Sequence, residues 1–196
     1  MIRNKFMGFI WKIKTIFYTA MLSAHGVSLS KSVTFLGGVK IYRGQGKGIM
    51  VGQRTVFASD LAANPLNTGI CIRLSLLTPS ATISIGDDCG ISECSITSQN
   101  EIFIGNRVLI GAGCSIFDTD FHLTASEDRR YNRSNAVIPS TPVIIDDDVW
   151  LGAKVTILKG VKIGKGSIIA AGSVVAGEIP DGVIAGGIPA KVIKLI

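Results

Sequence analysis

The stretch VIIDDDVWLGAKVTILKGVKIGKGSIIAAGSVV, from Val143 to Val175, repeats with a period of six residues. Every sixth residue is a large aliphatic one, and a valine or serine stands two places before each of them. The first set is Ile145, Leu151, Ile157, Ile163, Ile169 and Val175; the second is Val143, Val149, Val155, Val161, Ser167 and Ser173. A period of six matches neither a helix nor a hairpin sheet with its own turn signals. It predicts a chain that runs straight, bends and runs straight again.

The same register is present upstream of this stretch. Aliphatic residues keep it at Ile104, Ile110 and Ile116, at Ile83, Ile85 and Ile91, and more faintly at Ile49 and Val51. Glycine, which bends easily, often follows the aliphatic residue, as at Gly52, Gly86, Gly105, Gly111, Gly152 and Gly164. Three straight pieces close a triangle, and each coil stacks about 4.8 Å above the last. The sequence therefore predicts an all-β solenoid with a ladder of Ile, Leu and Val along its axis.

Composition fits one folded domain with an extension. Hydrophobic residues make up 47% of the 196 residues and charged residues 17%, which is not the profile of a disordered chain. The net charge of +6 is concentrated at the N-terminus and follows no nucleic-acid-binding motif, so we expect no nucleic acid partner. None of the four cysteines forms a CxxC pair, and we expect them to be reduced and packed. With only two histidines in the chain, we expect no metal site.

Residues 1–24 form a separate apolar and basic segment. Lys12 and Lys14 interrupt it, which argues against a secretory signal and against a spanning helix. Its large apolar residues recur at helical spacing: Phe6, Phe9, Ile10, Ile13, Ile16, Phe17 and Met21. Two interpretations stay open. Residues 1–22 form an interfacial helix on an anionic membrane, or they form a helix that packs on its own domain or on a neighbouring subunit.

Three motifs carry a resemblance to a known family. They are DTDFH at Asp118–His122, the repeat from Val149 to Val175, and the tail IPDGVIAGGIPAKVIK at Ile179–Lys194. Over roughly residues 33–196 the chain resembles the hexapeptide-repeat acyltransferases, and most closely the galactoside, maltose and polysaccharide O-acetyltransferases. The resemblance implies a left-handed parallel β-helix. The expected organisation is an N-terminal helical segment (1–24), a β-helix (25–180) with an extruded active-site loop (117–142), and a C-terminal tail (181–196).

The resemblance implies that the loop carries the catalytic residue. The six-residue rule fails between Ile116 and Val143, so this stretch must leave the prism. Transfer of an acetyl group from acetyl-CoA to a hydroxyl needs a group that removes the hydroxyl proton, and a neutral imidazole suits that role. His122 is therefore the expected general base, in a direct transfer without a covalent intermediate. Asp118 and Asp120 either orient the imidazole or hold the loop, and the sequence leaves both roles open.

Binding residues also follow from the resemblance. It implies that acetyl-CoA contacts Trp150, Gly152, Ala153, Ala171, Ala176 and Gly177, with Lys191 and Lys194 near its nucleotide. The acceptor candidates are Ser92 and Glu93, which break the aliphatic pattern, and the loop residues Arg129 and Arg130, with Arg133 nearby.

The predicted function is that of an acetyl-CoA-dependent O-acetyltransferase. We expect a homotrimer with sites between subunits, located in the cytoplasm near the inner face of the membrane. The expected acceptor is a sugar hydroxyl of a surface polysaccharide or of its lipid-linked precursor. Two alternatives stay open: another small acceptor, such as an amino sugar, serine or an antibiotic, and a non-enzymatic β-helix that binds a partner.

Overall fold

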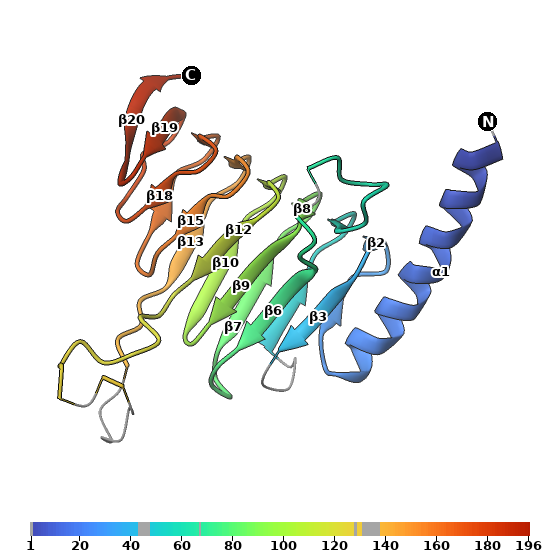
Figure 1. The fold of residues 1–196 in the computed structure, drawn as a ribbon, viewed down its shortest axis with the longest axis horizontal. Helices are drawn as coiled ribbons and strands as arrows, with labels where there is room; N and C mark the ends of the chain where they lie inside the picture. Colours follow the sequence, from blue (N-terminus) through green and yellow to red (C-terminus); the bar gives the residue numbers. More distant parts are fainter. Residues whose placement is uncertain (1, 43–47, 67, 128, 131–137) are drawn as a thin grey trace.

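Three parallel sheets form the sides of a long triangular prism (Figure 1). The computed structural model describes residues 2–42, 48–66, 68–127, 129–130 and 138–196. Sheet A consists of β1 (Ser28–Leu29), β4 (Ile49–Val51), β7 (Thr82–Ile85), β10 (Glu101–Ile104), β13 (Val143–Ile145) and β16 (Lys162–Ile163). Sheet B consists of β2 (Thr34–Leu36), β5 (Val56–Ala58), β8 (Gly90–Ser92), β11 (Leu109–Ile110), β14 (Trp150–Leu151), β17 (Ile168–Ile169), β19 (Val183–Gly187) and β20 (Ala190–Leu195). Sheet C consists of β3 (Val39–Tyr42), β6 (Ile72–Leu76), β9 (Cys94–Ser98), β12 (Cys114–Phe117), β15 (Thr156–Ile157) and β18 (Val174–Val175).

The chain visits sheets A, B and C in turn, and each strand pairs with the strand one coil away. Ile116 lies beside Ile157 and Ile96, for example, so like residues stack along the axis. The twelve residues of the two sets from Val143 to Val175 are all at most 1% exposed. This confirms the predicted register and the aliphatic ladder. Only β19 and β20 pair antiparallel among the described strands, and they close the C-terminal end of sheet B.

The corner between sheets A and B explains why glycine recurs there. At Gly52 and Gly105, an added Cβ atom would lie 2.3 and 2.5 Å from a carboxylate oxygen of the next coil, that of Asp87 and Asp147 respectively. Those oxygens accept hydrogen bonds from the backbone N–H of the residue after each glycine, at 2.7 Å in both cases. Glycine is needed because it leaves room for an oxygen that caps the turn.

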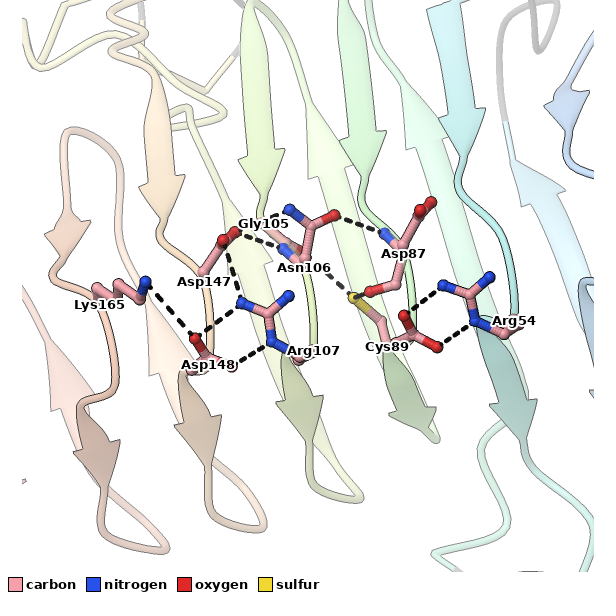
Figure 2. A network of polar contacts seen from close by, with 10 residues as sticks. Arg54, Asp87, Cys89, Gly105, Asn106, Arg107, Asp147, Asp148 and Lys165 are labelled. Carbon is pink, nitrogen blue, oxygen red and sulfur yellow. Dashed lines mark hydrogen bonds and ion pairs between the residues drawn. The ribbon is translucent and has the colours of Figure 1, made fainter.

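The same corner carries a ladder of alternating charge (Figure 2). The Arg54 guanidinium donates two hydrogen bonds of 2.6 Å to Asp88. One coil further, Arg107 donates from Nε and Nη2 to Asp148, at 2.5 and 2.9 Å. Lys165 follows at 4.0 Å from Asp148. The hydrogen bonds from Arg107 and Arg54 lower the pKa of Asp148 and of Asp88 below their usual range.

From these ion pairs we expect the protein to lose stability in acid. A carboxyl group whose pKa is lowered by folding stabilises the fold above its unfolded pKa, about 3.9 for Asp, and loses that contribution as the pH falls through the folded value. Thermal melts followed by circular dichroism should show Asp148→Asn melting below the wild type at neutral pH. The difference in melting temperature between the two proteins should narrow below about pH 4, where the carboxylate takes up a proton. It should also shrink at high salt, because the ion pair is exposed to solvent. A difference independent of pH would contradict this assignment.

Helix α1 (Ile2–Ala24) packs beside β1 and β2 at the N-terminal end of the prism (Figure 1). Thr15 Oγ1 accepts a hydrogen bond of 3.0 Å from the backbone N–H of Phe35, and the Tyr18 ring lies 5.8 Å from the Phe35 ring. Leu22 is buried in the core. The helix thus packs on its own domain along one face. Across the residues that the structure describes, no helix is both long enough and apolar enough to cross a bilayer.

Within the described residues, two segments leave the prism, from different corners. Residues 59–66 and 68–71 (the 59–71 segment) follow β5 at the corner between sheets B and C, and residues 118–127, 129–130 and 138–142 follow β12 at the corner between sheets C and A. Figure 1 shows them at opposite ends of the sheet C strands. The second segment is the extruded loop that the sequence predicted.

Candidate active site

The loop after β12 begins as a short two-stranded stalk. Asp120 N donates to Pro139 O at 3.1 Å, Thr141 N donates to Asp118 O at 2.9 Å, and Thr119 forms an antiparallel bridge with Ser140. The outgoing and returning chains are therefore tied together within four residues of the prism. The stalk gives the loop a defined direction.

Asp118 joins this stalk to the preceding coil. Its side chain is fully buried and accepts four hydrogen bonds from one turn. The donors are Ser98 Oγ at 3.0 Å, Gln99 N at 2.7 Å, Asn100 N at 2.8 Å and Glu101 N at 2.8 Å. The carboxylate thus supplies the acceptor for three backbone N–H groups that the turn between β9 and β10 leaves without a ladder partner.

Gln99 clamps both sides of the stalk. Its Nε2 donates to Ile138 O at 2.8 Å, and its Oε1 accepts from Thr119 Oγ1 at 2.8 Å. Asp120 adds an ion pair of 3.2 Å with Lys159, one coil further. The contacts of Asp118 and Asp120 are thus with the scaffold. Of the two roles that the sequence left open for these carboxylates, they support holding the loop.

His122 stands just beyond the stalk and is exposed. The preceding residue, Phe121, has a left-handed backbone with φ of 62°, and its ring lies 5.3 Å from that of Phe117. Such a conformation is uncommon for a bulky residue and is held in place by its surroundings. The His122 Nδ1 atom lies 3.1 Å from the carbonyl oxygen of Arg129. Because a carbonyl only accepts, this contact fits the tautomer with its proton on Nδ1, in which Nε2 is the basic nitrogen.

Most of the residues predicted to bind acetyl-CoA follow sheet B and its corner with sheet C. Trp150 projects from β14, and Gly152 and Ala153 form the corner that follows it. Ala171 occupies the next coil of this corner, where Ala153 O accepts from Gly172 N at 2.9 Å. Lys191 and Lys194 lie exposed on β20, at the C-terminal edge of the same sheet. Ala176 and Gly177 differ, because they follow β18 and turn the corner between sheets C and A.

The acceptor candidates are divided between two places. Glu93 is buried under the 59–71 segment, where its carboxylate accepts from the N–H and, at 2.7 Å, from the hydroxyl of Thr68. Ser92 precedes it and is half-buried. Arg129 lies in the loop, where its Nη2 donates to Thr124 O at 2.5 Å. Arg130 is exposed there, and Arg133 lies outside the described residues.

A cavity of about 470 Å³ lies between the 59–71 segment and the predicted coenzyme corner. It is lined by Pro65, Leu66, Thr68, Ala112, Ala153 and Lys154. The His122 loop starts at the other edge of sheet C. One protomer therefore does not bring His122 together with Ala153 or Glu93.

The cysteines are free thiols, and all but Cys71 are packed in the interior. All four are unbridged, and Cys89, Cys94 and Cys114 are buried. Burial raises the pKa of Cys114 to about 11, so its thiol stays protonated at neutral pH. Within the described ranges, no three His, Cys, Asp or Glu side chains are grouped so that they could hold a metal ion.

Several contacts were not foreseen from the sequence. The clamp of Gln99 and the ion pair of Lys159 lie on coils adjacent to the loop, and nothing in their local sequence marks them. The 59–71 segment did leave a signal, because the six-residue rule also fails between Phe57 and Ile72. Its Pro65 and Gly69 are typical of a loop.

Comparison with known proteins agrees with this fold. Residues 142–177 match the family model described as bacterial transferase hexapeptide (six repeats). The predicted resemblance to the hexapeptide-repeat acetyltransferases is confirmed. A solved hexapeptide-repeat acetyltransferase from Vibrio cholerae, in complex with acetyl-CoA, is 26% identical with a TM-score of 0.56, covering 90% of this chain and 75% of that one. The predicted fold class, a left-handed parallel β-helix, is confirmed.

Two curated relatives match shorter regions. The galactoside O-acetyltransferase of Lactococcus lactis is 40% identical over 106 residues, which are 52% of this chain and 47% of the relative. The 2,3,4,5-tetrahydropyridine-2,6-dicarboxylate N-acetyltransferase of Clostridium perfringens is 61% identical over 56 residues, which are 29% of this chain and 24% of the relative. The chain thus spans less than half of the length of either relative. One relative acetylates oxygen and the other nitrogen.

Proposed function

We propose that the protein transfers an acetyl group from acetyl-CoA to a hydroxyl group, with His122 as general base. The observation that carries this proposal is the state of His122. It is an exposed imidazole whose Nδ1 proton is directed to a carbonyl, on a loop fixed by buried contacts at its base. With the proton on Nδ1, the nitrogen that can act as the base is Nε2.

The proposed step is a direct acyl transfer. As Nε2 removes the proton, the acceptor oxygen attacks the thioester carbonyl. The new C–O bond forms, the C–S bond breaks, and the thiolate of CoA leaves with the proton that the imidazolium returns. The protonated state of Cys114 supports a mechanism without an acyl-enzyme.

The proposed acceptor is a sugar hydroxyl of a surface polysaccharide or of its lipid-linked precursor, modified in the cytoplasm at the inner face of the membrane. The region of similarity to galactoside O-acetyltransferase, longer than the one to the N-acetyltransferase, supports oxygen over nitrogen. An amino-sugar acceptor is the second candidate, because the more identical region is shared with an N-acetyltransferase.

The first test of this function follows CoA thiol release. Purified protein is mixed with acetyl-CoA and, separately, with sugars, nucleotide-sugars and amino sugars, and mass spectrometry identifies the product. Release that depends on a sugar without a free amine supports O-acetylation. Release only with amino sugars would replace it by N-acetylation, and no release with any acceptor would favour the non-enzymatic β-helix.

We further propose that the working unit is a homotrimer with sites between subunits. The loop that carries His122 and the corner that contains Ala153 lie at opposite edges of sheet C. A site that contains both residues therefore needs the loop of one subunit and the corner between sheets B and C of another. Outward apolar residues support such packing: Leu109 and Trp150 stack along sheet B, and Phe103 and Ile144 stack along sheet A. These side chains are exposed in one protomer.

This arrangement predicts complementation between two inactive variants. His122→Ala lacks the base, and Ala153→Trp fills the predicted coenzyme corner. When the two are unfolded and refolded together, mixed trimers should regain a measurable fraction of wild-type activity, since some sites combine an intact loop with an intact corner. Each variant refolded alone is the control. Activity that stays at the level of the single variants, or a monomer in light scattering, would contradict shared sites.

A further inference from the structure

Helix α1 is held against the prism by its inner face. Lys14 forms an ion pair with Asp60, Thr15 bonds to Phe35, and Tyr18 and Leu22 pack on the core. These contacts come from successive turns of the helix. They fix its rotation about its own axis, and therefore fix which side chains point away from the prism.

The outer face of α1, defined by Phe9, Ile13, Ile16 and Phe17, is apolar and open. These side chains are 62%, 52%, 70% and 59% exposed, and their spacing of four, three and one places them along one side of the helix. Lys12 lies among them and is exposed. Four large apolar side chains in one stripe exceed the scattered apolar residues of an ordinary surface and mark an interaction site.

Charge decides which partner fits this face. Helix α1 holds four of the twenty Lys and Arg residues, namely Arg3, Lys5, Lys12 and Lys14, and none of the fourteen Asp and Glu residues. Of these four, Lys14 is paired with Asp60 on the inner face. A second copy of the helix would bring an equal positive charge against this face. An anionic lipid surface offers an apolar interior and the opposite charge.

We propose that the outer face of α1 lies in the interface of an anionic membrane. An interfacial helix of this kind rests about 5–10 Å deep, with apolar side chains among the acyl chains and lysines at the headgroups. Its 23 residues lie along the surface and do not cross it. The N-terminal end of the prism then faces the lipid. Binding of lipid does not depend on acetyl transfer, although it would bring the proposed site close to a lipid-linked acceptor.

The test is flotation of the full chain with vesicles. One set is phosphatidylcholine alone, and the other is equal parts phosphatidylcholine and phosphatidylglycerol. Wild-type protein should float with the anionic set and much less with the neutral one, and added salt should reduce flotation. The variant Phe9→Gln/Ile16→Gln should bind anionic vesicles at least about tenfold more weakly, since it removes two buried apolar side chains.

The matched control is Leu61→Gln/Ile70→Gln, which removes two exposed apolar side chains of another surface segment. It should float like the wild type, and circular dichroism should show that both double variants are folded. Equal flotation of the two variants, or none of the wild type with anionic vesicles, would overturn the proposal. The proposal would also be overturned if the wild type formed a larger assembly and only Phe9→Gln/Ile16→Gln made that assembly smaller, because the face would then bind a second copy. Thiol release measured without vesicles tests the acetyl transfer separately.

Discussion

Replacing His122 by alanine should lower the rate of acetyl transfer by about 10²- to 10⁴-fold and leave the affinity for acetyl-CoA unchanged. The rate falls because the attacking hydroxyl keeps its proton. The affinity stays because most of the predicted coenzyme residues lie along sheet B and its corner with sheet C, away from the corner between sheets C and A where the loop begins. Thiol release gives the rate, and isothermal titration calorimetry gives the affinity.

His25→Ala is the matched control for this prediction. His25 is the only other histidine, and it directly follows helix α1, where its Nδ1 lies 2.7 Å from Met21 O. Its loss should leave both the rate and the affinity unchanged. If the two alanine variants turned over equally, His122 would have no catalytic role. If His122→Ala lost coenzyme binding together with activity, the loop would belong to the coenzyme site.

The sequence predicted the fold well because the fold is one-dimensional. Each coil contacts only its neighbours, so a local period of six residues, read from Val143 to Val175, sets the inward positions of the whole prism. The loop around His122 was predicted for the same reason, as the place where that period fails. Both depend on residues that are close in the chain.

Other contacts could not be predicted, because they join residues that only the coiling brings together. Gln99 reaches Thr119 and Ile138 from the adjacent coil, and Thr68 reaches the buried Glu93 from a segment that breaks the repeat. For α1, the period of the apolar residues predicted a helix but did not separate its inner face from its outer one. That division depends on the Lys14–Asp60 and Thr15–Phe35 contacts.

The two aspartates of the DTDFH motif should differ strongly when each is replaced by alanine. Asp118→Ala removes the acceptor of four hydrogen bonds and leaves three backbone N–H groups of a partly buried turn unsatisfied. We expect it to lower the free energy of unfolding by about 2–4 kcal/mol and to abolish most activity, because the stalk loses its attachment. Asp120→Ala removes one half-exposed ion pair with Lys159 and should lower the free energy of unfolding by about 1 kcal/mol or less.

Urea unfolding measures the global effect of each variant, and amide hydrogen exchange measures the local one. In Asp118→Ala the amides of Gln99, Asn100 and Glu101 should exchange faster, whereas in Asp120→Ala they should be protected as in the wild type. The effect of Asp118→Asn should fall between these two. Its amide keeps one acceptor oxygen, but its own N–H donors then face the backbone N–H donors of the turn. The outcome separates the two roles of Asp118. If the carboxylate oriented the imidazole, its replacement would lower the rate of acetyl transfer without changing stability or amide exchange. If it holds the stalk, its replacement must change the rate, the stability and the exchange together.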